Sequence, residues 1–200
     1  MTKQAFNYFL LHAGSLLIFS SLLVSCHTET LDSKTKQVFR YNEHKNIGSL
    51  DPAFAKDNAD IWAINQLFNG LVQMDSLMNV TPAIAQFWTI SDDAKVYTFS
   101  LRKDVNFHSH PQFGEHQTRT VTAHDFVYSF DRLKNPQLAS PGSWVLQNVD
   151  LYKAIDQHTF QINLKTPFPA FLGLLTMKYC SVVPKEIVTL YGSDFRSNPI

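Results

Sequence analysis

The chain has 200 residues, of which 44% are hydrophobic and 17% are charged. This composition is typical of a globular protein and excludes both an intrinsically disordered chain and a bundle of membrane-spanning helices. Lys and Arg balance Asp and Glu at 17 each, and this lack of excess positive charge argues against nucleic-acid binding.

The N-terminal segment has the pattern of a secretory signal. It contains one cation, Lys3, no acidic residue, and an apolar run over residues 13–24. The run of about 12 residues is too short for a membrane span, which needs about 20. It ends in the sequence LVSC, which resembles the lipobox of bacterial lipoproteins. That resemblance implies a signal peptide over residues 1–25 and a lipid attached to Cys26, whereas the alternative is an ordinary signal peptide with an incidental cysteine.

Residues 26–37 are polar and lack an apolar period, so we expect a flexible tether between the anchor and a folded domain over residues 38–200. If Cys26 carries lipid, Cys180 has no partner, and a disulfide within the chain is excluded.

Strands and helices are expected to alternate along the folded domain. Period-2 alternation and turn signals predict strands at residues 37–42, 71–75, 95–107 and 158–164. Apolar residues at helical spacing, with Pro or Gly near the ends, predict helices at residues 59–69, 81–88, 122–134, 168–176 and 184–192. The order favours an α/β or α+β domain.

Two local signals are sharper than the rest. Thr122 and Asp125 have the spacing of a helix capping box, with Asp in place of Glu. Asp92 and Asp93 are read as part of a hairpin turn rather than as a catalytic carboxylate pair.

Trp62 and Trp88 are expected in the core, whereas Trp144 follows a Ser-Pro-Gly turn and is a candidate for ligand contact.

The order of short motifs resembles the N-terminal part of the family 5 extracellular solute-binding proteins of bacterial ABC importers. The motifs are, in chain order, GSLDPAF, NQLFNGLVQMD, PAIAQFWTISDDAKVYTFSLRKDVNFH, VTAHDFVYSFDRL, SPGSW, KTPFPAFLGLL and VPKEIV. The resemblance implies an α/β lobe of the type II periplasmic-binding-protein kind, with a mixed sheet and flanking helices. It also implies that the second lobe, which would complete a ligand cleft, is missing from this chain.

The resemblance further implies a non-enzymatic receptor that captures peptides outside the cytoplasmic membrane and delivers them to ABC permease subunits. Such a protein would be a monomer in the periplasm or cell envelope, held on the membrane by its lipid, without a cofactor. Peptide-binding members hold the ligand backbone as an added strand. The ligand-binding residues implied here are Asn46, Ile47, Gly48, Ser143 and Trp144.

Three alternatives stay open at this point. His108, His110, His116 and His124 could bind nickel or a metal chelate, although a solvated polar loop is the simpler interpretation. A lipoprotein hydrolase lacks any nucleophile or zinc motif in this sequence. The third alternative is a truncated, non-functional remnant. Separately, the loop at residues 108–120 departs from the D-G-x-P turn that members of the family usually have.

Overall fold

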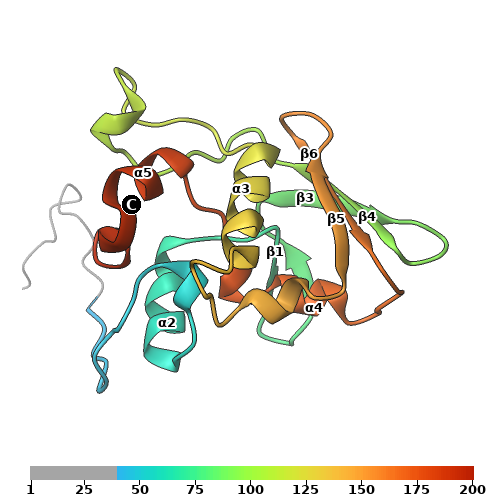
Figure 1. The fold of residues 1–200 in the computed structure, drawn as a ribbon, viewed down its shortest axis with the longest axis horizontal. Coiled ribbons are helices and arrows are strands. Elements are labelled where there is room, and N and C mark those ends of the chain that lie inside the picture. The colour runs from blue at the N-terminus through green and yellow to red at the C-terminus, as the bar shows by residue number, and fades with distance from the viewer. Residues whose placement is uncertain (1–39) are drawn as a thin grey trace, which may run out of the picture. The chain divides into compact units, whose positions relative to one another are not determined.

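A computed structural model describes residues 40–200, and Glu43–Ile200 form one compact unit (Figure 1). The predicted signal peptide, Cys26, the whole predicted tether at residues 26–37 and residues 37–39 of the predicted first strand lie outside the described residues. Arg40, Tyr41 and Asn42 are not in a strand, so that part of the predicted strand at 37–42 is wrong. No helix within residues 40–200 is long and apolar enough to cross a membrane.

The core of the unit is a four-stranded antiparallel sheet in the order β3-β4-β6-β5. Its strands are β3 (Ala85–Ile90), β4 (Val96–Leu101), β5 (Val149–Ala154) and β6 (Thr159–Leu164). In the central pair Tyr97 lies opposite Ile162 and Phe99 opposite Phe160. Because side chains alternate across a strand, this register buries one face of β4 and β6, whereas the other keeps half-buried Thr, Ser, Gln and Asn side chains.

Helix α3 (Ala123–Lys134) packs on the buried face of the sheet, beside β5 and β6 (Figure 1). The ring centroids of Phe126 and Phe130 lie 5.6 and 5.5 Å from that of Phe160. The predicted capping box is present, because Thr122 and Asp125 each satisfy a backbone group of the other. Local capping and the apolar stripe therefore place the helix where the sequence predicted it.

Smaller elements surround this centre. Helices α2 (Asn58–Leu67), α4 (Phe171–Leu175) and α5 (Lys185–Tyr191) confirm three further predictions. A separate hairpin joins β1 (Val72–Met74) to β2 (Val80–Pro82). Five 3-10 turns complete the described elements: η1 (Pro52–Phe54), η2 (Pro111–Phe113), η3 (Ser143–Leu146), η4 (Lys178–Cys180) and η5 (Gly192–Arg196).

The structure corrects the prediction at residues 81–88, which are extended in β2 and β3 rather than helical. A β-bulge between Ala85 and Phe87 breaks the period-2 pattern, so the strand was hidden in the sequence. Strand β5 was missed for the same reason, since its register shifts between Val149 and Leu151. Trp88 packs on the core as expected, but Trp62 is exposed.

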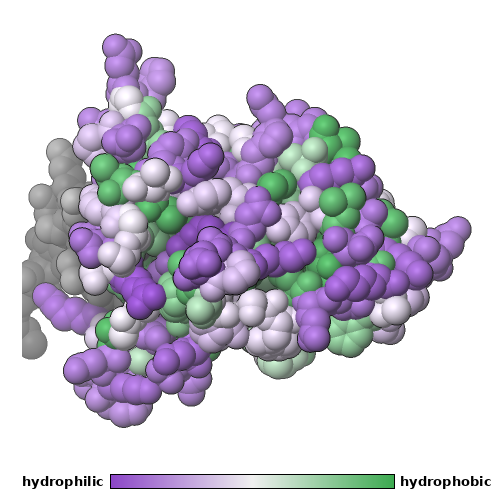
Figure 2. All heavy atoms as spheres, viewed as in Figure 1, coloured by the Kyte–Doolittle hydropathy of each residue, from purple (hydrophilic) through white to green (hydrophobic). Residues whose placement is uncertain are grey.

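The predicted α/β fold with helices flanking a sheet is confirmed, and the strand pairings within residues 40–200 refine the sheet from mixed to antiparallel. Hydrophobic side chains also reach the surface over this sheet (Figure 2), where β3 exposes Phe87 and β5 exposes Leu151.

Candidate functional site

The segment that contains Asn46, Ile47 and Gly48 is fixed at its C-terminal end by a buried carboxylate. Asp60, on the buried side of α2, accepts hydrogen bonds from the backbone N–H of Gly48 at 2.7 Å and of Ser49 at 3.2 Å. A buried carboxylate needs such donors, and the two amides supply them. The sequence did not reveal this role, although an Asp between the buried Ala59 and Ile64 was a possible signal.

Residues 50–53, which follow this segment, are held by an ion pair as well as by hydrogen bonds. Asp51 caps η1 through the backbone N–H of Ala53, and it also forms a two-pronged ion pair with Arg132 of α3 at 3.1 and 2.7 Å. The side chains of Asp51 and Arg132 are 3% and 11% exposed, so the pair is largely shielded from solvent. The backbone N–H of Leu50 donates to the carbonyl of Arg196 at 2.8 Å. Residues 48–53 are therefore held by three different parts of the fold.

By contrast, Asn46 and Ile47 lie on the surface, and the Ile47 side chain is 45% exposed. Within residues 40–200, the backbone N–H and C=O groups of Asn46 and Ile47 form no hydrogen bond. Backbone polar groups require partners, so these groups are open to water or to a ligand. A stretch of main chain without partners among the described residues thus lies directly before an anchored one.

The second predicted segment is attached to η1. The Ser140 hydroxyl donates to the carbonyl of Ala53 at 2.6 Å and accepts from the backbone N–H of Gly142 at 3.1 Å. A Cβ atom at Gly142 would lie 2.3 Å from the ring of Tyr179, so only glycine fits this approach. Ser143 and Trp144 then open η3 with both side chains exposed.

The structure therefore links the two predicted segments through Ala53 and Ser140. No hydrogen bond or ring contact within residues 40–200 joins Asn46, Ile47 or Gly48 directly to Ser143 or Trp144.

The histidines of the 108–120 loop do not converge. Among residues 40–200, no three His, Cys, Asp or Glu side chains are grouped in a way that could hold a metal ion. His110 instead orders the loop, because its Nδ1 accepts from the backbone N–H of Gln112 at 3.1 Å and its Nε2 lies 3.2 Å from the Tyr191 hydroxyl. Both ring nitrogens are thus engaged within the fold.

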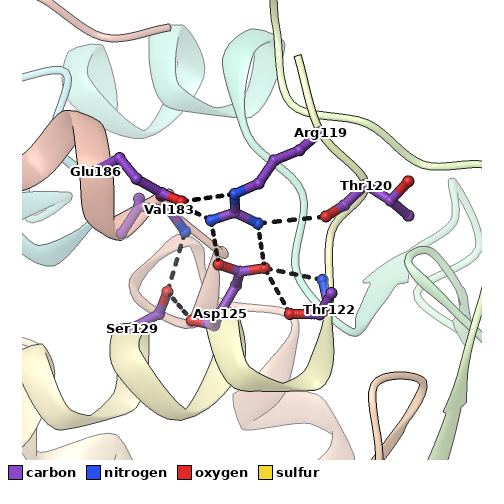
Figure 3. Close-up of polar contacts among 7 residues, drawn as sticks. All are labelled: Arg119, Thr120, Thr122, Asp125, Ser129, Val183 and Glu186. Atoms are coloured by element: carbon purple, nitrogen blue, oxygen red, sulfur yellow. Dashed lines mark hydrogen bonds and ion pairs between the residues drawn. The ribbon is translucent and has the colours of Figure 1, made fainter. Parts of the chain in front are cut away.

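Arg119, at the end of the same loop, joins three elements (Figure 3). Its guanidinium donates to Asp125 of α3 at 2.9 and 2.7 Å and to Glu186 of α5 at 2.8 and 2.7 Å. Hydrogen bonds from Arg119 lower the pKa of the Glu186 carboxyl. Since each nitrogen of the guanidinium has a partner, this cluster is structural. No local sequence pattern predicted it.

No nucleophile emerges from the described cysteine. Cys180 is fully buried, and burial raises the pKa of its thiol to about 12. A thiol that stays protonated at neutral pH is inert as a nucleophile.

Comparisons with known proteins agree with this architecture. Residues 79–200 match the family model described as bacterial extracellular solute-binding proteins, family 5 Middle. The chain is 34% identical over 177 residues to the periplasmic oligopeptide-binding protein OppA of Salmonella typhimurium, covering 80% of this chain and 31% of that protein. It is 32% identical over 177 residues to the probable deoxycholate-binding periplasmic protein YgiS of Escherichia coli, covering 80% and 32%.

Among solved structures, the substrate-binding domain of an oligopeptide ABC transporter from Bacillus anthracis superposes with a TM-score of 0.72 at 26% identity. That match covers 81% of this chain and 33% of the other. The chain spans about a third of the length of the curated relatives it matches.

Proposed function

Because the chain belongs to the bacterial extracellular solute-binding proteins of family 5, we propose that it serves peptide capture for an ABC importer. In this proposal it binds peptides outside the cytoplasmic membrane and passes them to permease subunits. The names of several relatives support the choice of ligand, since they describe oligopeptide- and dipeptide-binding proteins.

The observation that carries the proposal is the backbone of Asn46 and Ile47, which forms no hydrogen bond within residues 40–200, beside the anchored amide of Gly48. An extended peptide can pair with such groups by strand addition, in which main-chain hydrogen bonds provide affinity with little dependence on side chains. Because Asp60 already holds the backbone amide of Gly48 in place, peptide binding costs less conformational entropy in this segment. Ser143 and Trp144 are proposed as a second set of ligand contacts.

The remaining features of the proposal come from the sequence. They are a signal peptide at residues 1–25, a lipid on Cys26, a tether at residues 26–37 and a lobe at residues 38–200. We propose a monomer, held by its lipid in the periplasm or cell envelope, that binds ligand without catalysis. A Cys26→Ala variant is then expected in the soluble fraction, because stable anchoring depends on the acyl chains.

Calorimetric titration of the purified protein with short peptides tests the ligand and the binding mode together. Ile47→Pro removes one backbone N–H, whereas the matched control Ile47→Ala keeps that N–H and shortens the side chain. We expect the proline variant to lose about tenfold or more in affinity, which corresponds to about 1.4 kcal/mol, and the alanine variant to lose little.

Stability should not change in either variant by more than a fraction of a kcal/mol, because the Ile47 N–H has no partner within residues 40–200. Equal losses in the two variants would contradict strand addition, and no heat with any peptide would contradict the ligand class.

A further inference from the structure

Lys178, in the 3-10 turn η4, is a half-buried cation without an anionic partner among the described residues. Its side chain is partly shielded from water, and burial lowers the pKa of its ammonium group. Within residues 40–200, its Nζ atom forms no ion pair and no hydrogen bond. A shielded charge is costly unless it is paired, so this part of the fold holds a cation without supplying its counter-charge.

The backbone fixes the position from which the Lys178 side chain extends. The backbone N–H of Cys180 donates to the carbonyl of Met177 at 2.9 Å, and that of Ser181 donates to the carbonyl of Lys178 at 3.1 Å. Tyr179 and Cys180, which follow Lys178 in η4, are both buried. Binding at the ammonium group therefore has to order the rotamers of one side chain only, which limits its entropic cost.

Element η4 packs against the supports of both candidate ligand segments. It contacts η1, which follows the 46–48 segment, and α2, which holds the backbone amide at the end of that segment. Directly after Lys178, the ring of Tyr179 lies against the backbone of Gly142, which precedes the pair Ser143 and Trp144. Lys178 is thus a neighbour of the proposed peptide site.

Three acidic side chains next to η1 and α2 are engaged elsewhere. Asp51 is paired with Arg132 at 2.7 Å, and Asp57 is paired with Lys45 at 3.3 Å. Asp60 accepts hydrogen bonds from two backbone amides. The ammonium group in η4 therefore keeps its full positive charge, and a ligand that approaches it is favoured if it carries an anionic group.

We propose that the Lys178 ammonium group binds a carboxylate of the peptide ligand and so helps to determine which peptides are captured. This inference rests on the proposed function and adds a subsite to it. A peptide offers a carboxylate from two sources, its C-terminus and the side chains of Asp or Glu. Either carboxylate forms a charge-assisted hydrogen bond with an ammonium group, which is stronger than a bond between neutral partners.

Calorimetric titration with matched peptides tests the subsite. One pair of alanine tripeptides differs only in a free or an amidated C-terminus, and a second pair, amidated throughout, differs only in Asp or Asn at the central residue. We expect the wild type to favour the carboxylate form of at least one pair by about tenfold, and Lys178→Met to show a preference of about twofold or less. The control Lys56→Met removes an exposed cation two residues beyond η1 and should keep the wild-type preference.

Urea unfolding separates this role from a structural one. Methionine keeps much of the length of the side chain and removes a half-buried charge without a partner, so the urea midpoint of Lys178→Met should equal or exceed that of the wild type. A preference for the carboxylate form that persists in Lys178→Met overturns the proposal. So does a wild type that binds both members of each peptide pair equally.

A second readout does not depend on peptide binding. Reductive methylation with a carbon-13 label marks the lysines for NMR, and the Lys178 signal is the one that Lys178→Met lacks. N-acetylglycine should shift this signal, whereas N-acetylglycinamide, which lacks the carboxylate, should not. If the wild type binds no peptide but this shift occurs, the carboxylate subsite stands and only the proposed peptide ligand fails. If the wild type binds no peptide and no shift occurs, the subsite is wrong as well.

Discussion

Replacing Arg119 with methionine tests how firmly the loop at residues 108–120 is tied to the two helices behind it. Methionine keeps much of the aliphatic volume but removes all hydrogen bonds to Asp125 and Glu186. The guanidinium carbon also lies 4.9 and 5.6 Å from the ring centroids of Phe107 and Phe113, so a cation–π contribution is lost as well.

The magnitude follows from the different exposure of the two ion pairs. The Asp125 side chain is only 6% exposed, and breaking a buried pair from one side costs about 3–5 kcal/mol. Asp125 keeps its hydrogen bonds from the backbone N–H and hydroxyl of Thr122, both at 2.9 Å, so we expect the lower end, about 3 kcal/mol. The Glu186 side chain is 39% exposed, and Glu186→Gln should cost no more than about 1 kcal/mol.

A matched control exists on the surface. Arg102 forms a similar two-pronged pair with Asp104 at 3.0 and 2.9 Å, but the two side chains are 47% and 71% exposed. Arg102→Met should therefore change stability much less than Arg119→Met does, because water already solvates both partners of the exposed pair.

Urea unfolding followed by far-ultraviolet circular dichroism measures these differences, provided that the slope against urea is the same in all variants. Two outcomes would contradict a buried, structural role for Arg119: Arg119→Met no more destabilising than Arg102→Met, or Glu186→Gln as destabilising as Arg119→Met.

Three further predictions concern pH, packing and the proposed ligand segment. Arg119 lowers the pKa of the Glu186 carboxyl in the folded state. The stability that this ion pair adds is therefore complete above the ordinary glutamate pKa of roughly 4.3, and it is lost as pH falls through the lower pKa of the folded protein. Urea midpoints measured from neutral to acidic pH should show this loss in the wild type and a weaker one in Glu186→Gln. Gly142→Ala should destabilise the protein by about 1–3 kcal/mol through its clash with Tyr179, and a melting temperature equal to that of the wild type would contradict this. Asp60→Ala should weaken peptide binding in calorimetric titration by about tenfold, because the two backbone amides that it holds become free, and unchanged affinity would show that the anchor is dispensable.

The candidate site illustrates which parts of a function can be predicted from sequence. Asn46, Ile47, Gly48, Ser143 and Trp144 came from the resemblance to a family, and their role in binding stays a prediction. Their mechanical support was not predicted, because Asp60 reaches Gly48 across 12 positions and Ser140 reaches Ala53 across 87. Contacts over such separations depend on how the elements pack, which no local pattern records.

Features whose causes lie within a few residues could be predicted from the amino-acid sequence. The capping box at Thr122 and Asp125 started α3, and strict alternation marked β4 and β6, because hydrogen bonds and side-chain directions in these elements are set locally. Three other features became visible only in the folded chain: residues 85–90 form a bulged strand, Arg119 connects a loop to α3 and α5, and the His110 ring supports a turn rather than a metal site. Those outcomes require partners distant in the chain, and the free energy that selects them exists only once the core has brought those partners together.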